Sequence, residues 1–202
     1  MGDRRMVLGF PPSAPGPKPG WRARSSWVIT AAAFACAFIG VAQAGEQEPG
    51  YALKAGYLAK FTPFVDWPET AFEAPGSPFR LCVGGRDPFG GAIDRVAGVL
   101  HVGDHPVTVI RLPTVAKGVG CHLLFLSASR QQTPQQMLAV VAGKPVLTVA
   151  DEDLEASGAM VQFVTVENRL RFSIRADAAQ AAGLTLSSKL LALSAPPRDG
   201  GK

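Results

Sequence analysis

Three short apolar runs, each bounded by polar or turn-forming residues, constrain the fold of this chain more than any other feature. Apolar runs of about four to eight residues are typical of strands that are buried on both faces of a sheet. Helical patterns lie between the runs, and one of them opens with Thr133 as N-cap and Pro134 at the first helical position. This alternation predicts an α/β fold with a mostly parallel sheet. The runs are FRLCV from residue 79, CHLLFLSAS from 121 and PVLTVAD from 145.

Helices are also expected at both ends of this pattern. The segment 51–67 places Phe61 and Val65 on one apolar stripe, and Pro68 ends it. The C-terminal stretch is again helical in pattern, with a break at Gly183. Together with the helices between the strands, these elements would cover both faces of the sheet.

A hairpin is expected before the C-terminal helical stretch. The segments 159–166 and 169–176 have strand patterns and are separated only by Glu167-Asn168. The alternating segment 107–112 adds a further strand. The predicted architecture is a single-domain, Rossmann-like sheet that is mostly parallel, carries an antiparallel C-terminal hairpin and has helices on both faces.

The N-terminal part has the composition of a targeting segment. Basic residues precede an uncharged apolar run at 27–44, which ends in the small-residue pattern Ala42-Gln43-Ala44. An uncleaved anchor is the alternative, but the run is shorter than the about 20 apolar residues that span a bilayer. We therefore predict a signal peptide with an extended N-region at 1–44, an α/β domain at 45–195 and a disordered tail at 196–202, with the mature chain in the periplasm.

The charge balance changes when the predicted leader is removed. Residues 1–44 hold 5 of the 20 Lys and Arg residues and 1 of the 16 Asp and Glu residues, so the mature chain keeps 15 of each. Its formal net charge is zero. Nucleic-acid binding would require a clustered cationic surface. The composition therefore gives no support to a nucleic-acid partner.

Two cysteines remain after export. Cys36 lies in the predicted leader, which leaves Cys82 and Cys121. An even number of cysteines in an oxidising compartment favours a disulfide. Two buried free thiols are the alternative, because cysteine packs well as a small apolar residue.

The glycine-rich segment VGGRDPFGG, residues 83–91, raises the question of nucleotide binding. Two of its glycines have the spacing of a phosphate-binding loop, but Gly91 and Ala92 stand where that loop needs Lys and Ser or Thr. Asp87 instead resembles an N-cap with Pro88 at the first helical position. We predict a turn with a structural role and no cofactor. Its residues are Gly85, Asp87, Pro88 and Gly90.

No arrangement of catalytic or metal-binding residues is recognisable in the sequence. His122 adjoins Cys121, but neighbours on a strand point to opposite faces. His101 and His105 share a turn, where such residues are common. We therefore predict neither an enzyme nor a metal site. The acidic cluster is expected to be a solvated turn, and it consists of Asp151, Glu152, Asp153 and Glu155.

The second strand of the predicted hairpin carries alternating basic residues. Leu170, Phe172 and Ile174 face one way. The opposite face is either solvated or forms a basic strip for an acidic protein partner, since arginine is favoured in interfaces. That face carries Arg169, Arg171, Ser173 and Arg175.

Four stretches together resemble the YfiR family of periplasmic α/β proteins. The resemblance covers about Leu53 to Leu193 and implies a repressor that binds the periplasmic portion of an inner-membrane diguanylate cyclase. Repression would lower cyclic-di-GMP and biofilm formation. The family also implies a homodimer and an outer-membrane lipoprotein partner. The stretches are LKAGYLAKFTPFVDWP, FRLCVGGRDPFG, CHLLFLSAS and NRLRFSIRADAAQAAGLTLSSKLLAL.

The resemblance also bears on the cysteines and leaves a second function open. Cys82 and Cys121 match the positions of one family disulfide, whereas the segment 151–164 lacks the cysteine of a second bridge found in the best-studied type. The alternative function is a periplasmic sensor module that acts with a membrane sensor kinase. It would bind a small ligand, such as an amino acid or an aromatic compound, in a cleft at the strand ends.

Overall fold

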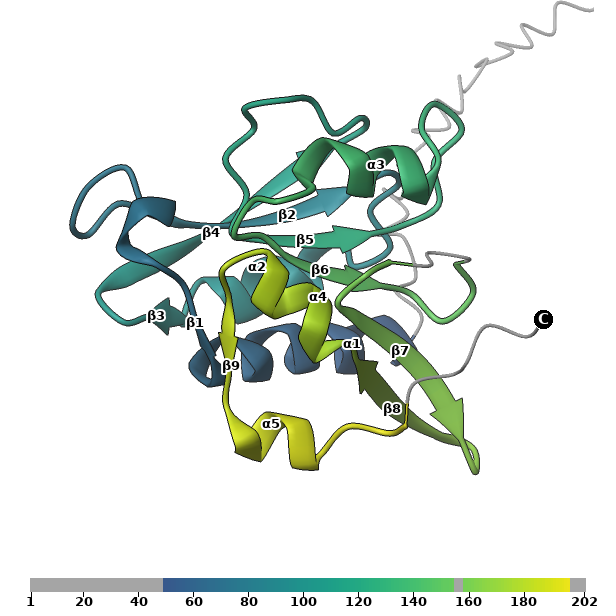
Figure 1. Ribbon diagram of the computed structural model, residues 1–202. Helices are drawn as coiled ribbons and strands as arrows, with labels where there is room; N and C mark the ends of the chain where they lie inside the picture. Colours follow the sequence, from purple (N-terminus) through teal and green to yellow (C-terminus); the bar gives the residue numbers. More distant parts are fainter. Residues whose placement is uncertain (1–48, 155–157, 197–202) are drawn as a thin grey trace, which may run out of the picture. The chain divides into compact units, whose positions relative to one another are not determined.

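The computed structural model describes residues 49–154 and 158–196 of the chain (Figure 1). The predicted signal peptide at 1–44 and residues 197–202 of the predicted tail lie outside the described residues. Among the helices of the described residues, none is long and apolar enough to cross a membrane.

A mixed seven-stranded sheet forms the centre of the described residues, in the order β3-β4-β2-β5-β6-β7-β8. The five inner strands are parallel, and β3 and β8 pair antiparallel at the two edges. The α/β class and the antiparallel hairpin agree with the sequence prediction. The strands are β2 (Phe79–Gly84), β3 (His101–Val102), β4 (His105–Leu112), β5 (Leu123–Leu126), β6 (Leu147–Ala150), β7 (Val161–Val166) and β8 (Arg169–Ile174).

The direction of winding reverses beside β2. Helix α2 (Gly91–Ala97) connects β2 to β4 on one side of β2, and the chain then crosses back to β5 on the other side. Helix α3 (Pro134–Val141) continues from β5 to β6. Loops at the carboxyl ends of the two strands at such a reversal lead in opposite directions, which opens a crevice between them.

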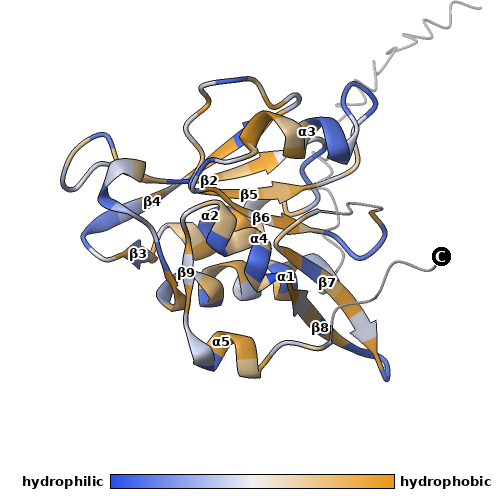
Figure 2. Ribbon diagram, in the orientation of Figure 1, coloured by the Kyte–Doolittle hydropathy of each residue, from blue (hydrophilic) through white to orange (hydrophobic). Residues whose placement is uncertain are grey.

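The larger core lies between the sheet and four helices. Helices α1 (Pro49–Phe61), α2, α4 (Ala176–Ala181) and α5 (Ser188–Ala192) all contribute buried residues to it, and Figure 1 shows them on one side of the sheet. Aromatic rings fill its centre, where Phe61 lies 4.9 Å from Phe172 and 6.1 Å from Phe163 between ring centroids. The central strands β2 and β5 are mostly hydrophobic (Figure 2), as burial on both faces requires.

Helix α3 covers the opposite face and the smaller core, into which Met137 and Val141 project. Its start follows the prediction. The Thr133 hydroxyl accepts a hydrogen bond from Gln136 N, and the Gln136 side chain accepts one from Thr133 N. This reciprocal capping satisfies two backbone donors that the helix itself leaves unpaired.

The first helix is shorter than predicted. It ends at Phe61 and is followed by the 3-10 helix η1 (Thr62–Phe64) and by β1 (Val65–Asp66). The prediction that it extends to Pro68 was wrong because Pro63 lacks an N–H and cannot continue an α-helix. A second 3-10 helix, η2 (Glu69–Ala71), follows within the expected loop.

The C-terminal stretch is also more divided than predicted. The break at Gly183, where φ is 79°, leads into β9 (Thr185–Leu186) before α5 begins. Strand β9 pairs antiparallel with β1, and together they form a separate two-stranded sheet. Two-residue strands have too little periodicity to be recognised from sequence.

The hairpin forms as predicted, from β7 to β8. Glu167 and Asn168 have φ values of 50° and 57°. Positive φ at both central residues is the geometry of the two-residue turn that matches the twist of antiparallel strands. The register places Phe163 opposite Phe172 on the side of the larger core.

Candidate functional site

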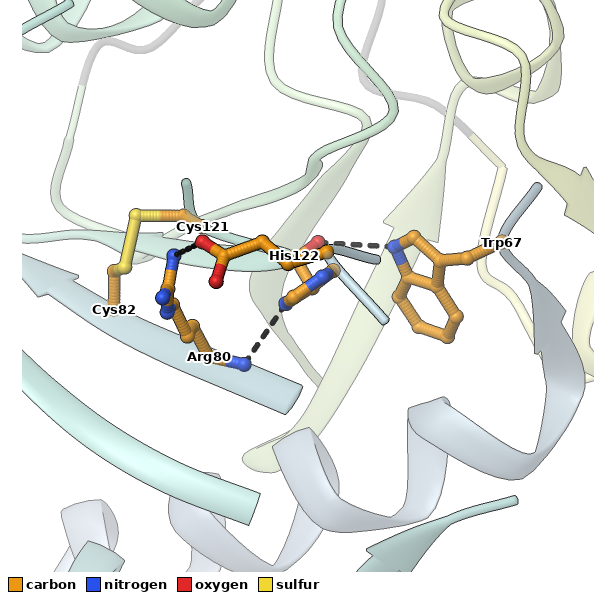
Figure 3. The surroundings of a disulfide bond; sticks show 6 residues. Trp67, Arg80, Cys82, Cys121 and His122 are labelled. Carbon is orange, nitrogen blue, oxygen red and sulfur yellow. Dashed lines mark hydrogen bonds and ion pairs between the residues drawn. A yellow bond between two sulfur atoms is a disulfide. The ribbon is translucent and has the colours of Figure 1, made fainter. Parts of the chain in front are cut away.

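The structure contains a disulfide between Cys82 and Cys121 (Figure 3). The two Cα atoms are 5.8 Å apart, and both residues lie in the smaller core. Cys82 belongs to β2, and Cys121 lies just before β5. The bridge therefore ties the connection between β4 and β5 to the middle of the sheet, and the alternative of two free thiols does not apply.

The neighbouring His122 points away from the disulfide and serves the backbone. Its Nδ1 accepts a hydrogen bond from Arg80 N at 2.9 Å, and its Nε2 lies 3.0 Å from Ala71 O, to which it donates. The Trp67 indole donates to His122 O at 3.1 Å. Burial lowers the pKa of His122, so the ring is neutral at pH 7. These contacts give His122 a structural role.

Phe72 lies against both this histidine and His105. Its ring centroid is 3.8 Å from that of His105 and 4.6 Å from that of His122, in stacked geometry. His105 Nδ1 is also 2.6 Å from Ser77 O. The segment 67–78 thus covers the starts of β2, β4 and β5, which we call the amino edge of the sheet.

The opposite edge of the sheet is open. We define the carboxyl edge as the segments that follow the parallel strands, namely 85–88 after β2, Pro113 after β4, 127–131 after β5 and 151–154 after β6. Two cavities of about 570 and 540 Å³ lie along it. Both are within the usual size range of small-molecule sites, roughly 300–1,000 Å³.

The two cavities share Arg86 and Ala128 but differ in charge. The basic cavity, of about 570 Å³, is lined by Arg86 and Arg130 together with Gly85, Pro113, Ala128, Ser129 and Gln131. None of the described residues that line it is acidic. The acidic cavity, of about 540 Å³, includes Asp87, Asp151 and Asp153 in its lining.

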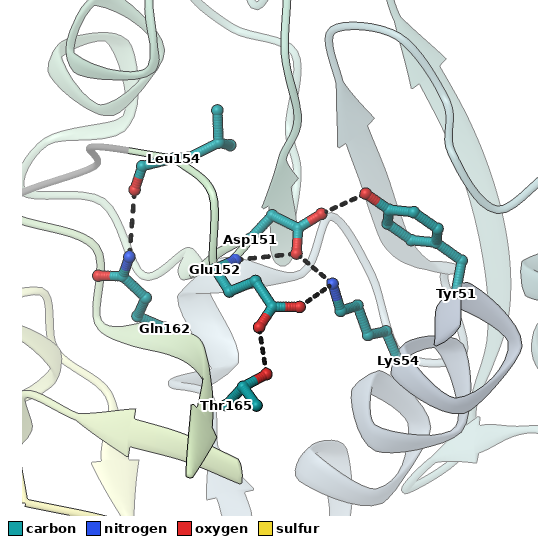
Figure 4. Close-up of polar contacts among 7 residues, drawn as sticks. All are labelled: Tyr51, Lys54, Asp151, Glu152, Leu154, Gln162 and Thr165. Atoms are coloured by element: carbon teal, nitrogen blue, oxygen red, sulfur yellow. Dashed lines mark hydrogen bonds and ion pairs between the residues drawn. The ribbon is translucent and has the colours of Figure 1, made fainter. Parts of the chain in front are cut away.

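A buried ionic network forms the wall of the acidic cavity (Figure 4). Lys54 Nζ, on α1, lies 2.6 Å from Asp151 Oδ1 and 3.0 Å from Glu152 Oε1. The Tyr51 hydroxyl donates to Asp151 Oδ2 at 2.7 Å, and the Thr165 hydroxyl donates to Glu152. The network joins α1, the end of β6 and strand β7.

The electrostatics of this network favour its charged form. Burial opposes the charge of Lys54, but hydrogen bonds and attraction to Asp151 and Glu152 outweigh it and raise the pKa of Lys54. The hydrogen bond from Thr165, followed by the contact with Lys54, lowers the pKa of Glu152. The Lys54 side chain is therefore held as a cation against Asp151 and Glu152 at neutral pH.

The prediction of a solvated acidic turn was wrong for Asp151, which is only 4% exposed. Glu155, the last residue of that cluster, lies outside the described residues. Lys54 was missed altogether, although a signal existed. It lies between Tyr51 and Leu58 at helical spacing, on the stripe of α1 that packs on the sheet. A lysine on such a stripe requires a buried carboxylate partner.

The glycine-rich turn after β2 differs in detail from its prediction. Helix α2 begins at Gly91 with Gly90 as N-cap, so Asp87 is not the N-cap and Pro88 is not the first helical residue. Asp87 Oδ1 accepts a hydrogen bond from Phe89 N at 2.7 Å, which forms a turn before the helix begins. Its Oδ2 accepts one from Arg111 Nε at 2.6 Å.

Arg111 binds this turn to α2. Its guanidinium donates to both carboxyl oxygens of Asp94, at 3.0 and 2.6 Å, and to Gly90 O at 3.0 Å. The Arg111 contact lowers the pKa of Asp94, and the hydrogen bonds that Arg111 donates to both carboxylates raise the pKa of Arg111. The carboxylates of Asp87 and Asp94 are thus already occupied by an arginine of the chain.

The predicted arginine strip lies on β8, the edge strand of the sheet. Arg169, Arg171 and Arg175 are exposed, and Arg175 Nη2 lies 3.7 Å from Asp177. Ser173, expected on the same solvated face, is instead buried. The C-terminal segment pairs with β8 at this point, where Ala195 N donates to Phe172 O at 2.8 Å. The part of β8 before this contact carries the exposed side chains of Arg169 and Arg171.

The fold and these contacts define a disulfide-linked α/β domain with a charged, cavity-bearing edge, an architecture suited to binding. Within the described residues, no group of three or more His, Cys, Asp or Glu residues could hold a metal ion.

A family model described as YfiR/HmsC-like matches residues 51–195, and the chain belongs to the YfiR/HmsC-like family. No curated protein matches the sequence. The family is periplasmic and regulatory, and membership indicates a regulator of cyclic-di-GMP signalling with a membrane signalling partner.

Proposed function

We propose that this chain represses an inner-membrane diguanylate cyclase by binding the periplasmic portion of the cyclase. The observation that carries the proposal is the family match over residues 51–195. Because a diguanylate cyclase produces cyclic-di-GMP, its repression lowers the level of this messenger and with it biofilm formation. Export through the N-terminal segment 1–44 places the repressor on the correct side of the membrane. Homodimer formation and capture by an outer-membrane lipoprotein belong to the same proposal.

The arginine strip is the surface that we assign to the cyclase. Arg169 and Arg171 are exposed on an edge strand, and neither has an ion-pair partner among the described residues. Arginine is enriched in protein interfaces, and paired charges on the two partners guide association and fix its geometry. Charged residues on an edge strand also prevent aggregation. Substitution by glutamate distinguishes the two roles, because the edge strand stays charged while its attraction to an acidic partner is lost.

The test compares two double variants in a strain that lacks the native gene. Arg169→Glu/Arg171→Glu reverses the strip, and Lys117→Glu/Lys144→Glu makes the same change of charge at exposed lysines away from β8. We expect the wild-type chain and the lysine variant to lower intracellular cyclic-di-GMP, and the arginine variant to leave it high at equal periplasmic abundance. Equal repression by both variants would exclude the strip as the binding surface.

A further inference from the structure

We propose that the basic cavity binds a small organic anion through Arg86 and Arg130. The proposal concerns a ligand site and does not depend on the cyclase as partner. It is carried by three observations, namely the place of the cavity in the sheet, the charges that line it and the rigidity of its walls.

The cavity lies at the reversal of the strand order. Arg86 follows β2, and Ser129 and Arg130 follow β5, the two strands between which the direction of winding changes. In open α/β sheets, ligands bind in the crevice at the carboxyl ends of the strands at this point. The amino edge, by contrast, is covered by the segment 67–78.

The charges of the cavity select an anion. Arg86 and Arg130 have no carboxylate partner among the described residues, whereas Arg111 is bound by two aspartates and Arg80 lies 2.8 Å from Glu73. A guanidinium presents several donors in a planar fork, which fits a carboxylate or a phosphate group. A cavity lined by two arginines without a carboxylate partner among the described residues therefore suits an oxyanion better than a neutral or cationic ligand.

The walls of the cavity are held in place without a ligand. Arg86 N donates to Ala128 O at 2.9 Å, and Gly85 N donates to Leu112 O at 2.8 Å, so the ends of β2, β4 and β5 are joined. A Cβ atom at Gly85 would lie 2.7 Å from Ser127 O, which shows how closely the two backbones approach.

The loop after β5 is fixed on its other side as well. The Ser129 hydroxyl accepts hydrogen bonds from Gln131 N and Gln132 N, at 3.2 and 3.3 Å. The Gln132 side chain bonds both Val115 N and Val115 O, at 2.7 and 3.0 Å. A site that is already ordered loses little entropy when a ligand binds.

The size and surroundings of the cavity narrow the ligand class further. A volume of about 570 Å³ accommodates a small metabolite. The acidic cavity begins at Arg86 and Ala128 and places the exposed Asp153 on the far side, where its carboxylate repels an extended polyanion. The ligand is thus a small molecule with one carboxylate or phosphate head group or two close together, and the two chemistries are distinguished by the probes.

The test is a calorimetric titration of the purified exported protein with three probes: succinate, inorganic phosphate and glycerol 3-phosphate. We expect saturable binding of succinate if the ligand is a carboxylate, or of the other two probes if it is a phosphate. Replacement by Arg86→Gln/Arg130→Gln should weaken binding roughly tenfold or more, because two charge-assisted hydrogen bonds are lost. Lys117→Gln/Lys144→Gln removes two charges at exposed lysines that line neither cavity; it is the matched control and should bind as the wild type does.

Thermal unfolding of both variants verifies that the fold is retained, since all four substituted side chains are exposed. The NMR chemical shifts of the backbone amides locate the bound probe on the wild type. They should change at Gly85 and at residues 128–131. Absence of saturable binding by all three probes would overturn the proposal. Equal affinity of the wild type and the Arg86→Gln/Arg130→Gln variant would also overturn it.

Discussion

The two edges of the parallel strands are built from different interactions. At the amino edge, Phe72 stacks on His105 and His122, and the disulfide holds Cys121, the residue before His122. The cavity next to Cys121 measures only about 200 Å³. At the carboxyl edge, ion pairs and backbone hydrogen bonds fix the positions of the loops, which surround cavities of about 570 and 540 Å³.

The two edges of one sheet thus have different roles: the amino edge contributes to stability, and the carboxyl edge is available for binding. Aromatic stacking and a covalent bridge close the amino edge, and the polar groups of its histidines are satisfied internally. Ionic contacts cannot close the carboxyl edge in the same way, because charged side chains require either partners or water. The carboxyl edge, where Arg86 and Arg130 have no carboxylate partner among the described residues, is consequently the one available to ligands.

The largest effect is expected from removal of the disulfide at the amino edge. The variant Cys82→Ala/Cys121→Ala should lose about 4 kcal/mol of unfolding free energy, because the unfolded chain is no longer constrained by a loop of 39 residues. Urea unfolding of the oxidised wild type and of the double variant measures this loss. Reduced wild-type protein serves as the control, and it should unfold at about the same urea concentration as the double variant. A loss below about 1 kcal/mol would show that the amino edge does not depend on the bridge.

Much of this architecture could be predicted from sequence, and the parts that could not have physical causes. The buried strands and α3 were predictable because apolar runs and the Thr133 cap are local signals. The pairing of Lys54 with Asp151 joins residues separated by 97 positions, and nothing local specifies it. The basic cavity is likewise formed by Arg86 and Arg130 from two different loops, which become neighbours only through the strand order.

The second effect concerns the ionic network at the carboxyl edge. Lys54→Met should cost about 3 kcal/mol, because Asp151 remains buried without its cation. Lys60→Met, on the same helix but exposed, is the matched control and should stay within about 0.5 kcal/mol of the wild type. Chemical denaturation measures both. Equal stability of the two variants would mean that the network does not hold the carboxyl edge.

A glycine comparison tests the rigidity of the same edge. Gly85 and Gly118 have φ values of 95° and 84°, but only at Gly85 would a Cβ atom meet backbone, at 2.7 Å. Gly118→Ala should cost about 1 kcal/mol through backbone strain alone. Gly85→Ala should cost about 3 kcal/mol, because the strands must also separate. Similar melting temperatures for the two variants would contradict the close approach of β2 and β5.

The smallest effect is a pH dependence at the amino edge. Burial lowers the pKa of His122 from its usual 6.5, and the hydrogen bond to Ala71 O only partly opposes this effect. The charges of Arg80 and His105 lower the pKa further against the weaker influence of Glu73. The unfolded chain therefore binds a proton more readily than the native chain, so stability should fall as the pH drops below about 6.5.

The slope cannot exceed about 1.4 kcal/mol per pH unit for this one group. Denaturation at pH 7.5 and pH 5.5 measures it, with His122→Asn as the variant that loses the slope and the exposed His101→Asn as the control that keeps it. An unchanged slope in His122→Asn would assign the pH dependence to other groups.

The central claim, that the chain represses a diguanylate cyclase from the periplasm, is tested most directly by intracellular cyclic-di-GMP in the native host. The gene is deleted and then restored either as the full chain or without residues 1–44. We predict that deletion raises cyclic-di-GMP and that only the full chain restores the low level. An unchanged level after deletion, or equal restoration by the form without residues 1–44, would contradict the account.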